Sequence, residues 1–246
     1  MDRNSDLERL YLLLDRLQSR LQGTRLLAQC KGNMGWPLRG VYFFFEAGEH
    51  RPNGRPRVVR VGTHALIAQS KSSLWQRLSQ HRGVASGGGN HRGSVFRALV
   101  GEAIKRCGQY PSAVSWDVGS DPSKAAAQLG ISPEEVRLCE NPLEVAVSDR
   151  IRSMPFLWIS IDDEPGPGSD RGVIERNSIA LLSNYGKAAI DAPSSEWLGS
   201  HCGRERVRSS GLWNNIHVDE PYDPAFLPLL ERYVESTTSL RDNSPA

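Results

Sequence analysis

An aromatic segment followed by a tight turn places the strongest constraint on the fold of this chain. Residues 40–46 read GVYFFFE, and such a run of aromatic and β-branched side chains is typical of a buried strand. A polar stretch follows, and Asn53-Gly54 within it is a strong signal for a tight turn. Residues 57–62, RVVRVG, again suit a strand. The pattern predicts a β-hairpin, so we expect a sheet at the centre of the fold.

Helical patterns surround this hairpin. Residues 5–22 carry leucines at alternating steps of three and four, which indicates an amphipathic helix. A capping box of Ser132 and Glu135 predicts the start of another helix. The remaining pattern predicts helices at 72–82, 94–107, 132–152, 172–184 and 224–236, and a third strand at 156–162. We therefore predict an α/β fold of the α+β kind, with a small, mainly antiparallel three-stranded sheet flanked by helices and with helical additions at both ends.

Composition excludes several classes of protein. The 246-residue sequence contains no apolar run close to the roughly eighteen residues that are needed to span a membrane. The first twenty residues mix acids and bases, unlike a signal or transit peptide, so we expect a cytoplasmic protein. The four cysteines lie far apart without a Cys-x-x-Cys pair, which argues against a disulfide scaffold or a zinc ribbon.

The basic residues are almost all arginine. Only five of the 30 are lysine. Arginine binds phosphate with a planar fork that lysine lacks. A GC-rich coding sequence explains the same bias equally well. Only the positions of the arginines can show whether they serve to bind phosphate.

Four side chains of different chemistry fall around the predicted sheet. Tyr42 lies in the first strand, and Arg77 and His81 are four residues apart on one helix, at the border of its apolar stripe. Glu175 lies on a core-facing stripe, where a carboxylate is costly unless it is paired, hydrogen-bonded or bound to metal. Each also has a purely structural interpretation. Tyr42 could be an ordinary aromatic residue of the strand, and Arg77 and His81 could form a solvated flank of their helix. Glu175 could cap its helix. Together they suit phosphodiester cleavage, in which a carboxylate holds Mg²⁺, an arginine neutralises phosphate charge, and a phenol or imidazole activates water.

The order of these residues resembles a known family. Gly40-Val41-Tyr42 and Arg60-Val61-Gly62 are similar to the paired motif of the GIY-YIG nuclease superfamily. In that family a helix with a functional arginine, a third strand and a helix with a metal-binding glutamate follow the hairpin. The spacing of Arg77 and His81 is more similar to that of the restriction endonucleases than to that of the repair or homing members. The likeness covers roughly residues 38–186 with an insertion near 108–153, and leaves 1–37 and 187–246 as N-terminal and C-terminal extensions.

The resemblance implies a role for each matching residue. Tyr42 would activate or orient the attacking water, and Arg77 would bind the phosphate. His81 would lie beside the water or the phosphate, and Glu175 would be the single protein ligand of Mg²⁺ or Mn²⁺. Asn184 is the nearest candidate for an asparagine that often follows the last helix, although it could equally cap that helix.

The second motif departs from the family pattern, because Arg60 replaces its tyrosine. If Arg60 points into the site, it would hold phosphate and favour an ionised water or phenol. If it points outward, one catalytic group is missing. Strand alternation alone does not decide between the two.

A glycine-rich stretch is a candidate DNA contact outside the site. Residues 87–93 read GGGNHRG, so the backbone can approach a phosphate closely, and Asn90, His91 and Arg92 supply polar groups. The structural alternative is a flexible loop between helices.

These observations predict a metal-dependent endonuclease of restriction type that cuts double-stranded DNA. A double-strand cut by one small site would require a homodimer or two successive nicks, and a methyltransferase encoded nearby would be the expected partner. Three alternatives remain open: a catalytically impaired nucleic-acid-binding module, a repair-type nuclease specific for DNA structure, and an interaction protein that uses the N-terminal helix.

Overall fold

The computed structural model describes residues 2–108 and 110–240. Its elements, in chain order, are α1 (Arg3–Arg20), β1 (Arg25–Leu26), η1 (Leu27–Gln29), β2 (Gly40–His50), β3 (Pro56–Gly62), α2 (Leu74–Arg82), η2 (His91–Gly93), α3 (Val95–Arg106), α4 (Pro122–Leu129), α5 (Pro133–Arg152), β4 (Pro155–Ser160), α6 (Asp170–Leu182), η3 (Leu198–His201), α7 (Glu205–Ser210) and α8 (Phe226–Ser236). The described helices include none that is long and apolar enough to cross a membrane.

One antiparallel sheet of four strands, in the order β1-β4-β2-β3, forms the centre of the protein. The predicted fold class is confirmed, and the sheet has one strand more than predicted. The additional strand, β1, is only two residues long, which is too short to leave a periodic pattern in the sequence.

The hairpin forms where the sequence predicts it. Strands β2 and β3 pair with Tyr42 opposite Gly62 and Phe44 opposite Arg60. The register shifts after Phe44, so that Phe45 lies opposite Val58. A shift of this kind is a β-bulge, which bends a strand and re-aims its side chains.

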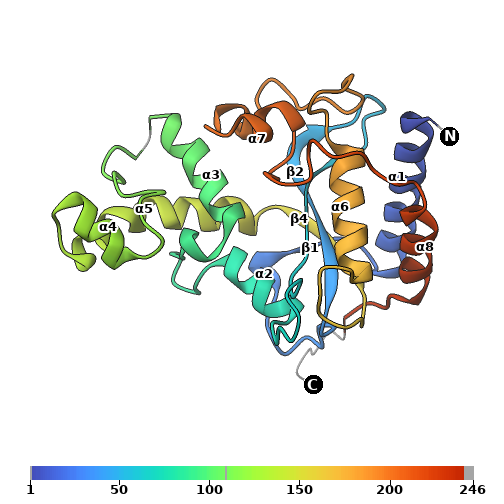
Figure 1. Ribbon diagram of the computed structural model, residues 1–246, viewed down its shortest axis with the longest axis horizontal. Coiled ribbons are helices and arrows are strands. Elements are labelled where there is room, and N and C mark those ends of the chain that lie inside the picture. The colour runs from blue at the N-terminus through green and yellow to red at the C-terminus, as the bar shows by residue number, and fades with distance from the viewer. Residues whose placement is uncertain (1, 109, 241–246) are drawn as a thin grey trace.

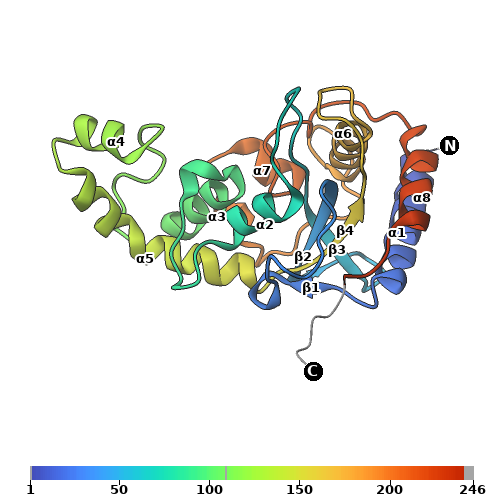
Figure 2. The same cartoon turned by 90° about the horizontal axis from the view of Figure 1, so that it is seen from below.

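Helices cover the sheet on both sides (Figures 1 and 2). Helices α1, α6 and α8 lie on one side and pack against one another, while α2 and α3 lie on the other. Alternation along β2 sends Tyr42 and Phe44 toward α2 and α3, where their rings meet His81 and Phe96. The candidate catalytic tyrosine therefore faces the helix that carries His81.

The segment between α3 and β4 forms a helical arm. Helix α4 and the first half of α5 project away from the sheet, and the second half of α5 leads back to β4 (Figures 1 and 2). Ala125, Ala126 and Val136 form a small separate core in this arm. The predicted capping box at Ser132 and Glu135 is present at the start of α5.

The outer edge of β3 is covered by a segment from the C-terminal part of the chain. The Trp213 amide donates to the Val59 carbonyl at 2.7 Å. The Asn214 side chain accepts from the Val61 amide at 3.2 Å and donates to the Val61 carbonyl at 2.9 Å. Residues 213–214 therefore occupy hydrogen-bonding groups that an open edge strand would leave unpaired.

Candidate active site

Tyr42 is the innermost member of the site. Its side chain has no exposed surface, and its phenol oxygen lies 2.7 Å from His81 Nε2. Gly62 lies opposite Tyr42 across the hairpin, and a Cβ atom on Gly62 would lie 2.4 Å from the phenol oxygen. The glycine of the second motif therefore leaves the space that the tyrosine of the first motif occupies.

His81 links Tyr42 to the start of helix α3. Its Nδ1 lies 2.8 Å from Ser94 Oγ. Burial, together with the nearby positive charges of Arg77 and Arg60, holds the pKa of His81 well below its ordinary value. His81 is therefore neutral in the folded protein at neutral pH, with one ring nitrogen that donates and one that accepts.

The side chain of Arg60 lies on the same face of the sheet as Tyr42. Residues that pair directly across an antiparallel ladder project to the same side, and Arg60 pairs with Phe44, next but one to Tyr42. Its guanidinium donates to the Trp213 carbonyl and lies 4.9 Å from the centre of the Phe96 ring. Burial lowers the pKa of Arg60, while Tyr42 and Glu175 act in the opposite direction. The question left open by strand alternation is thus decided in favour of an inward-pointing Arg60.

Arg77 lies at the solvent side of the site. It donates to Gln80 at 3.0 Å and to the Gly93 carbonyl at 3.3 Å. Its charge lowers the pKa of both His81 and Glu175. The part of the chain that the structure describes contains no ion-pair partner for Arg77, so its charge is available to a phosphate.

Glu175 reaches the site from helix α6. Its Oε1 accepts a hydrogen bond of 3.0 Å from the Thr63 amide, the first residue after β3. Burial raises the pKa of Glu175, and the opposing effects of Arg60, His217 and the Thr63 amide do not cancel this rise. The carboxylate is thus incompletely compensated by the protein. We call Tyr42, Arg60, Arg77, His81 and Glu175 the site cluster.

The site cluster contains one carboxylate that could hold a divalent metal. No group of three or more His, Cys, Asp or Glu side chains gathers within residues 2–108 and 110–240. A single hard oxygen ligand suits Mg²⁺, which keeps most of its waters when it binds protein. The raised pKa of Glu175 fits this assignment, since a cation would offset the cost of burying its charge.

Asn184 lies outside the site cluster. Its side chain donates to the Asp191 carbonyl at 3.0 Å and accepts from Arg3 and from the Ile190 amide. It follows the C-terminal end of α6, whereas Glu175 lies in the first half of that helix. The structure therefore places Asn184 among contacts that join the end of α6 to α1 and to the following loop.

The three residues of the predicted DNA contact have different surroundings. Asn90 is exposed, and its side chain accepts from the Arg92 amide at 3.0 Å. His91 is buried, stacks on Trp116 with ring centres 3.9 Å apart, and contacts Glu144 through both its amide and Nδ1. Arg92 donates two hydrogen bonds of 2.7 Å to Glu140, a second carboxylate of α5. The side chains of His91 and Arg92 therefore serve the interior of the protein.

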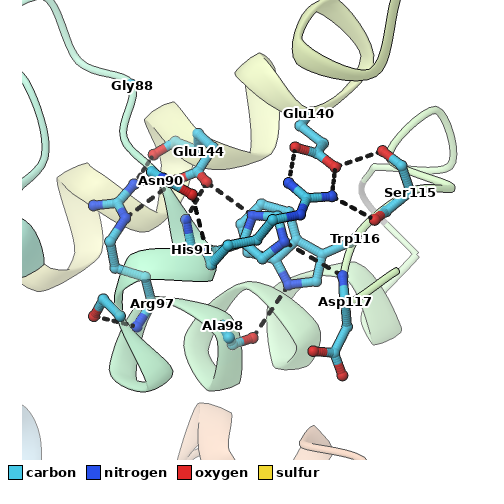
Figure 3. A network of polar contacts seen from close by, with 12 residues as sticks. Gly88, Asn90, His91, Arg97, Ala98, Ser115, Trp116, Asp117, Glu140 and Glu144 are labelled. Carbon is cyan, nitrogen blue, oxygen red and sulfur yellow. Dashed lines mark hydrogen bonds and ion pairs between the residues drawn. The ribbon is translucent and has the colours of Figure 1, made fainter. Parts of the chain in front are cut away.

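These contacts belong to a larger set that joins the helical arm to the rest of the protein. Arg97 of α3 pairs with Glu144 and donates to the His81 carbonyl at 3.0 Å. Figure 3 shows Glu144 between Arg97 and His91, and Glu140 beside Ser115. We call His91, Arg92, Arg97, Glu140 and Glu144 the anchor network.

Two residues near the site cluster are not evident from the sequence. Ser94 can be recognised as the cap of a helix, but its contact with His81 depends on the fold. His217 lies in a loop-rich part of the chain, has a left-handed backbone with φ of 63°, and contacts Glu220 at 2.7 Å. Its charge acts to lower the pKa of Glu175.

Comparison with known proteins identifies the family. A family model described as the GIY-YIG domain matches residues 1–240. The match includes the N-terminal helix and most of the C-terminal segment, which the motif resemblance leaves outside. Neither the curated proteins nor the solved structures contain a significant match. With the paired motif on the central hairpin and the family model matched over nearly the whole chain, this protein belongs to the GIY-YIG domain family.

Proposed function

We propose that this protein, a nuclease of the GIY-YIG superfamily, is a divalent-metal-dependent endonuclease that hydrolyses phosphodiester bonds in DNA. The observation that carries the proposal is the meeting of Tyr42, His81 and Arg60 on one face of the hairpin. Arg77 and Glu175 lie close enough for their charges to affect this group. Four separate parts of the chain thus supply one site.

Each side chain has a task that its surroundings support. Tyr42 would take a proton from the attacking water, and Arg60 would place a positive charge on the same face of the hairpin, where negative charge develops. Arg77, which has no ion-pair partner among the described residues, would bind the scissile phosphate and neutralise charge that develops on it. An arginine is suited to this because its planar fork matches two phosphate oxygens.

Glu175 would hold the metal, either Mg²⁺ or Mn²⁺. Such an ion, when bound, polarises a phosphate oxygen and supplies positive charge. Glu175 itself is positioned by the Thr63 amide, directly after the strand that carries Arg60. The hydrogen bond fixes one carboxylate oxygen and so orients the carboxylate.

A restriction-type role is the finer part of the proposal. It is supported by the Arg77-x-x-x-His81 spacing and by the contact between His81 and Tyr42. For a double-strand cut, the single site would act in a homodimer or nick the two strands in turn. A methyltransferase encoded nearby would protect the host sequence.

One observation favours a second candidate, a DNA-binding module that does not cut. Tyr42 and His81 have no exposed surface, and Arg60 stands where the family has a tyrosine. A water molecule reaches the phenol only if neighbouring side chains move.

Incubation of supercoiled plasmid with the purified protein tests the proposal. We expect nicked and linear products with Mg²⁺ or Mn²⁺, none with EDTA, and none with Glu175→Gln. Fragments of fixed length from a panel of plasmids would support restriction, and cleavage confined to branched DNA would support repair. Binding of DNA without cleavage under any metal would refute the nuclease proposal in favour of the binding module.

A further inference from the structure

The loop between β3 and α2, residues 63–73, carries the most exposed large apolar side chain among the described residues. Ile67 is 80% exposed. The adjacent Leu66 lies against the first turn of α6, where a Cβ atom on Gly172 would be 3.3 Å from Leu66 Cδ2. A single exposed isoleucine is common on protein surfaces and by itself marks no site. The construction and the position of this loop distinguish Ile67 from the other exposed apolar residues.

Hydrogen bonds give the 63–73 loop a defined shape. The Ser70 amide donates to the Ile67 carbonyl at 3.1 Å and closes a turn at the tip. The hydroxyl oxygens of Ser70 and Ser72 lie 3.2 Å apart. From α6, the completely buried Arg171 donates to the Ala65 carbonyl at 3.4 Å. Ile67 is thus held out from the protein by an ordered turn.

Two residues of the loop adopt an unfavourable backbone conformation. Ala65 has φ of 58° and Gln69 has φ of 64°, which is the left-handed region that disfavours residues with a Cβ atom. Gln69 is the third residue of the turn from Ile67 to Ser70, a position at which glycine is preferred when φ is positive. Local backbone preference therefore does not explain this shape. Strain of this kind is typical of segments whose shape serves a function.

Both ends of the loop join the site cluster. The Thr63 amide holds Glu175, and Ser73 caps helix α2, which carries Arg77. Because Ile67 follows Thr63 by four residues, the two Cα atoms lie within about 14 Å of each other. This distance is close to the width of the DNA major groove, which is about 12 Å. A duplex with a phosphate bound at Arg77 and Glu175 therefore passes close to the tip of the loop.

The other exposed side chains of the tip also suit DNA. Gln69 and Lys71 are exposed, and neither side chain has a partner among the described residues. Isoleucine is one of the apolar side chains that enter the grooves of DNA. A glutamine amide both donates to and accepts from base edges, and a lysine contacts phosphate. Figure 2 shows the loop projecting beside the loop between β4 and α6, at one end of the sheet.

An exposed carboxylate lies next to these groups. Glu164, in the loop between β4 and α6, lines a hollow of about 380 Å³ together with Gln69 and Lys71. A carboxylate repels a phosphate and attracts a cationic partner. Neutralising Glu164 therefore shows the sign of the charge that the loop binds.

We propose that residues 63–73 form a DNA-contacting loop, in which Ile67 packs into a groove of the duplex near the scissile phosphate and Lys71 contacts the DNA backbone. The proposal rests on the part of the proposed function that places DNA at the site cluster. Ile67 and Lys71 position the substrate and take no part in the reaction itself.

Photo-crosslinking tests the contact directly. Ile67 is replaced by p-benzoylphenylalanine, and the protein is irradiated with labelled plasmid fragments at low salt, in EDTA to keep the DNA intact. The same replacement of Leu138, which is 67% exposed on the helical arm, is the matched control. We expect strong crosslinking from position 67 and little from position 138. Equal crosslinking from the two positions would overturn the proposal.

Substitutions measure the contribution of each side chain to binding. We expect Ile67→Ala to weaken DNA binding by about tenfold, as loss of a buried apolar contact does. Lys71→Ala should reduce the slope of log affinity against log salt by about one, because one phosphate contact is lost. Glu164→Gln should tighten binding by about twofold to threefold. Thermal unfolding should show no loss of stability, since all three side chains are exposed.

Leu138→Ala and Lys124→Ala are the controls for these substitutions, because both residues lie on the helical arm, away from the loop (Figure 1). Both should bind DNA like the wild type. Unchanged affinity and salt dependence in Ile67→Ala and Lys71→Ala would overturn the proposal.

Plasmid cleavage separates this proposal from the proposed function. If the loop crosslinks to DNA but the wild-type protein cuts none with any metal, the nuclease proposal fails and the loop assignment stands. If Ile67→Ala and Lys71→Ala bind and cut DNA like the wild type, the loop assignment fails and the nuclease proposal stands. A wild-type protein that neither binds nor cuts DNA would refute both.

Discussion

The site cluster and the anchor network are built from the same residue types but differ in how completely they are paired. In the anchor network, burial acts to raise the pKa of Glu144, but hydrogen bonds from His91 and the charge of Arg97 hold it below its ordinary value. In the site cluster, burial raises the pKa of Glu175, whose only hydrogen bond among described residues comes from the Thr63 amide. The charge of the first carboxylate is fully compensated by the protein, and that of the second only in part.

The arginines show the same difference. Arg97 contacts Glu144 and two backbone carbonyls, and it is completely buried. Arg60 is also buried, yet its Nε has no partner, and Arg77 has no ion pair among described residues. The comparison teaches that buried charge alone does not mark a functional site. In the site cluster the charged groups are also incompletely paired, which leaves interaction capacity for a ligand.

The largest effect is expected for Glu175→Gln, which keeps the shape of the side chain and removes its charge. We expect the cleavage rate to fall by about ten-thousandfold or more, since the proposed metal would lose its protein ligand. Because the pKa of Glu175 is raised in the folded state, its ionised form destabilises the fold as the pH rises through the unfolded value. The variant should therefore be as stable as the wild type, or more so, at neutral pH. Plasmid cleavage and thermal unfolding measure the two effects, and a marked loss of stability would remove the contrast with Glu144.

Glu144→Ala should have the opposite signature. It leaves Arg97 buried without a carboxylate and His91 without its Nδ1 contact, and breaking a buried pair costs about 3–5 kcal/mol of unfolding free energy. Because the pKa of Glu144 is lowered, its stabilisation is present above the unfolded value and is lost as the pH falls through the folded one. Urea unfolding at several pH values checks this, with Glu134→Ala on the exposed side of α5 as the control. Equal stability of the two variants at neutral pH would show that the anchor network is not structural.

Arg77→Ala tests whether an unpaired arginine is reserved for the substrate. We expect the cleavage rate to fall by about a hundredfold, as loss of a transition-state charge partner does, with little change in stability. Arg77→Lys should recover only part of the rate, because the fork geometry is lost. Single-turnover cleavage and thermal unfolding provide the measurements. Full recovery by lysine would mean that charge alone matters at this position.

The smallest effect is expected for Arg60→Ala. We expect a rate loss of about tenfold at neutral pH, because a buried cation on the same face of the hairpin as Tyr42 is removed. The pH at which cleavage peaks should move upward, while Arg60→Lys should keep it near the wild-type value. A pH–rate profile for the three proteins measures this shift. An unaltered profile in Arg60→Ala would show that Arg60 acts on Tyr42 only through packing.

The parts of the fold that depend on local interactions could be predicted from the sequence. The hairpin follows from an apolar run, a turn and a second strand pattern, all within 25 residues. The start of α5 follows from two residues of a capping box, and α2 carries Arg77 and His81 on adjoining turns. That His81 and Tyr42 belong to one site is predicted only through the resemblance to a family, and their direct contact is not predicted at all.

The parts that depend on distant partners could not be predicted. The burial of His91 requires Trp116 and Glu144, which are 25 and 53 residues away. The direction of Arg60 depends on its pairing with Phe44 across the hairpin, a register that alternation within one strand does not reveal. The local sequence around His91 is therefore compatible with an exposed loop and with a buried contact, because the partners that decide between them lie far along the chain.

The segment that covers the edge of β3, residues 213–214, determines when the site can form during synthesis of the chain. The Trp213 carbonyl that accepts from Arg60 lies 153 residues after it in the chain. The hairpin therefore leaves the ribosome long before the segment that completes its edge and fixes Arg60. A nascent chain, or a product of interrupted translation that stops before residue 213, carries both motifs without a finished site. Assembly of the site thus depends on synthesis of the chain to at least residue 213.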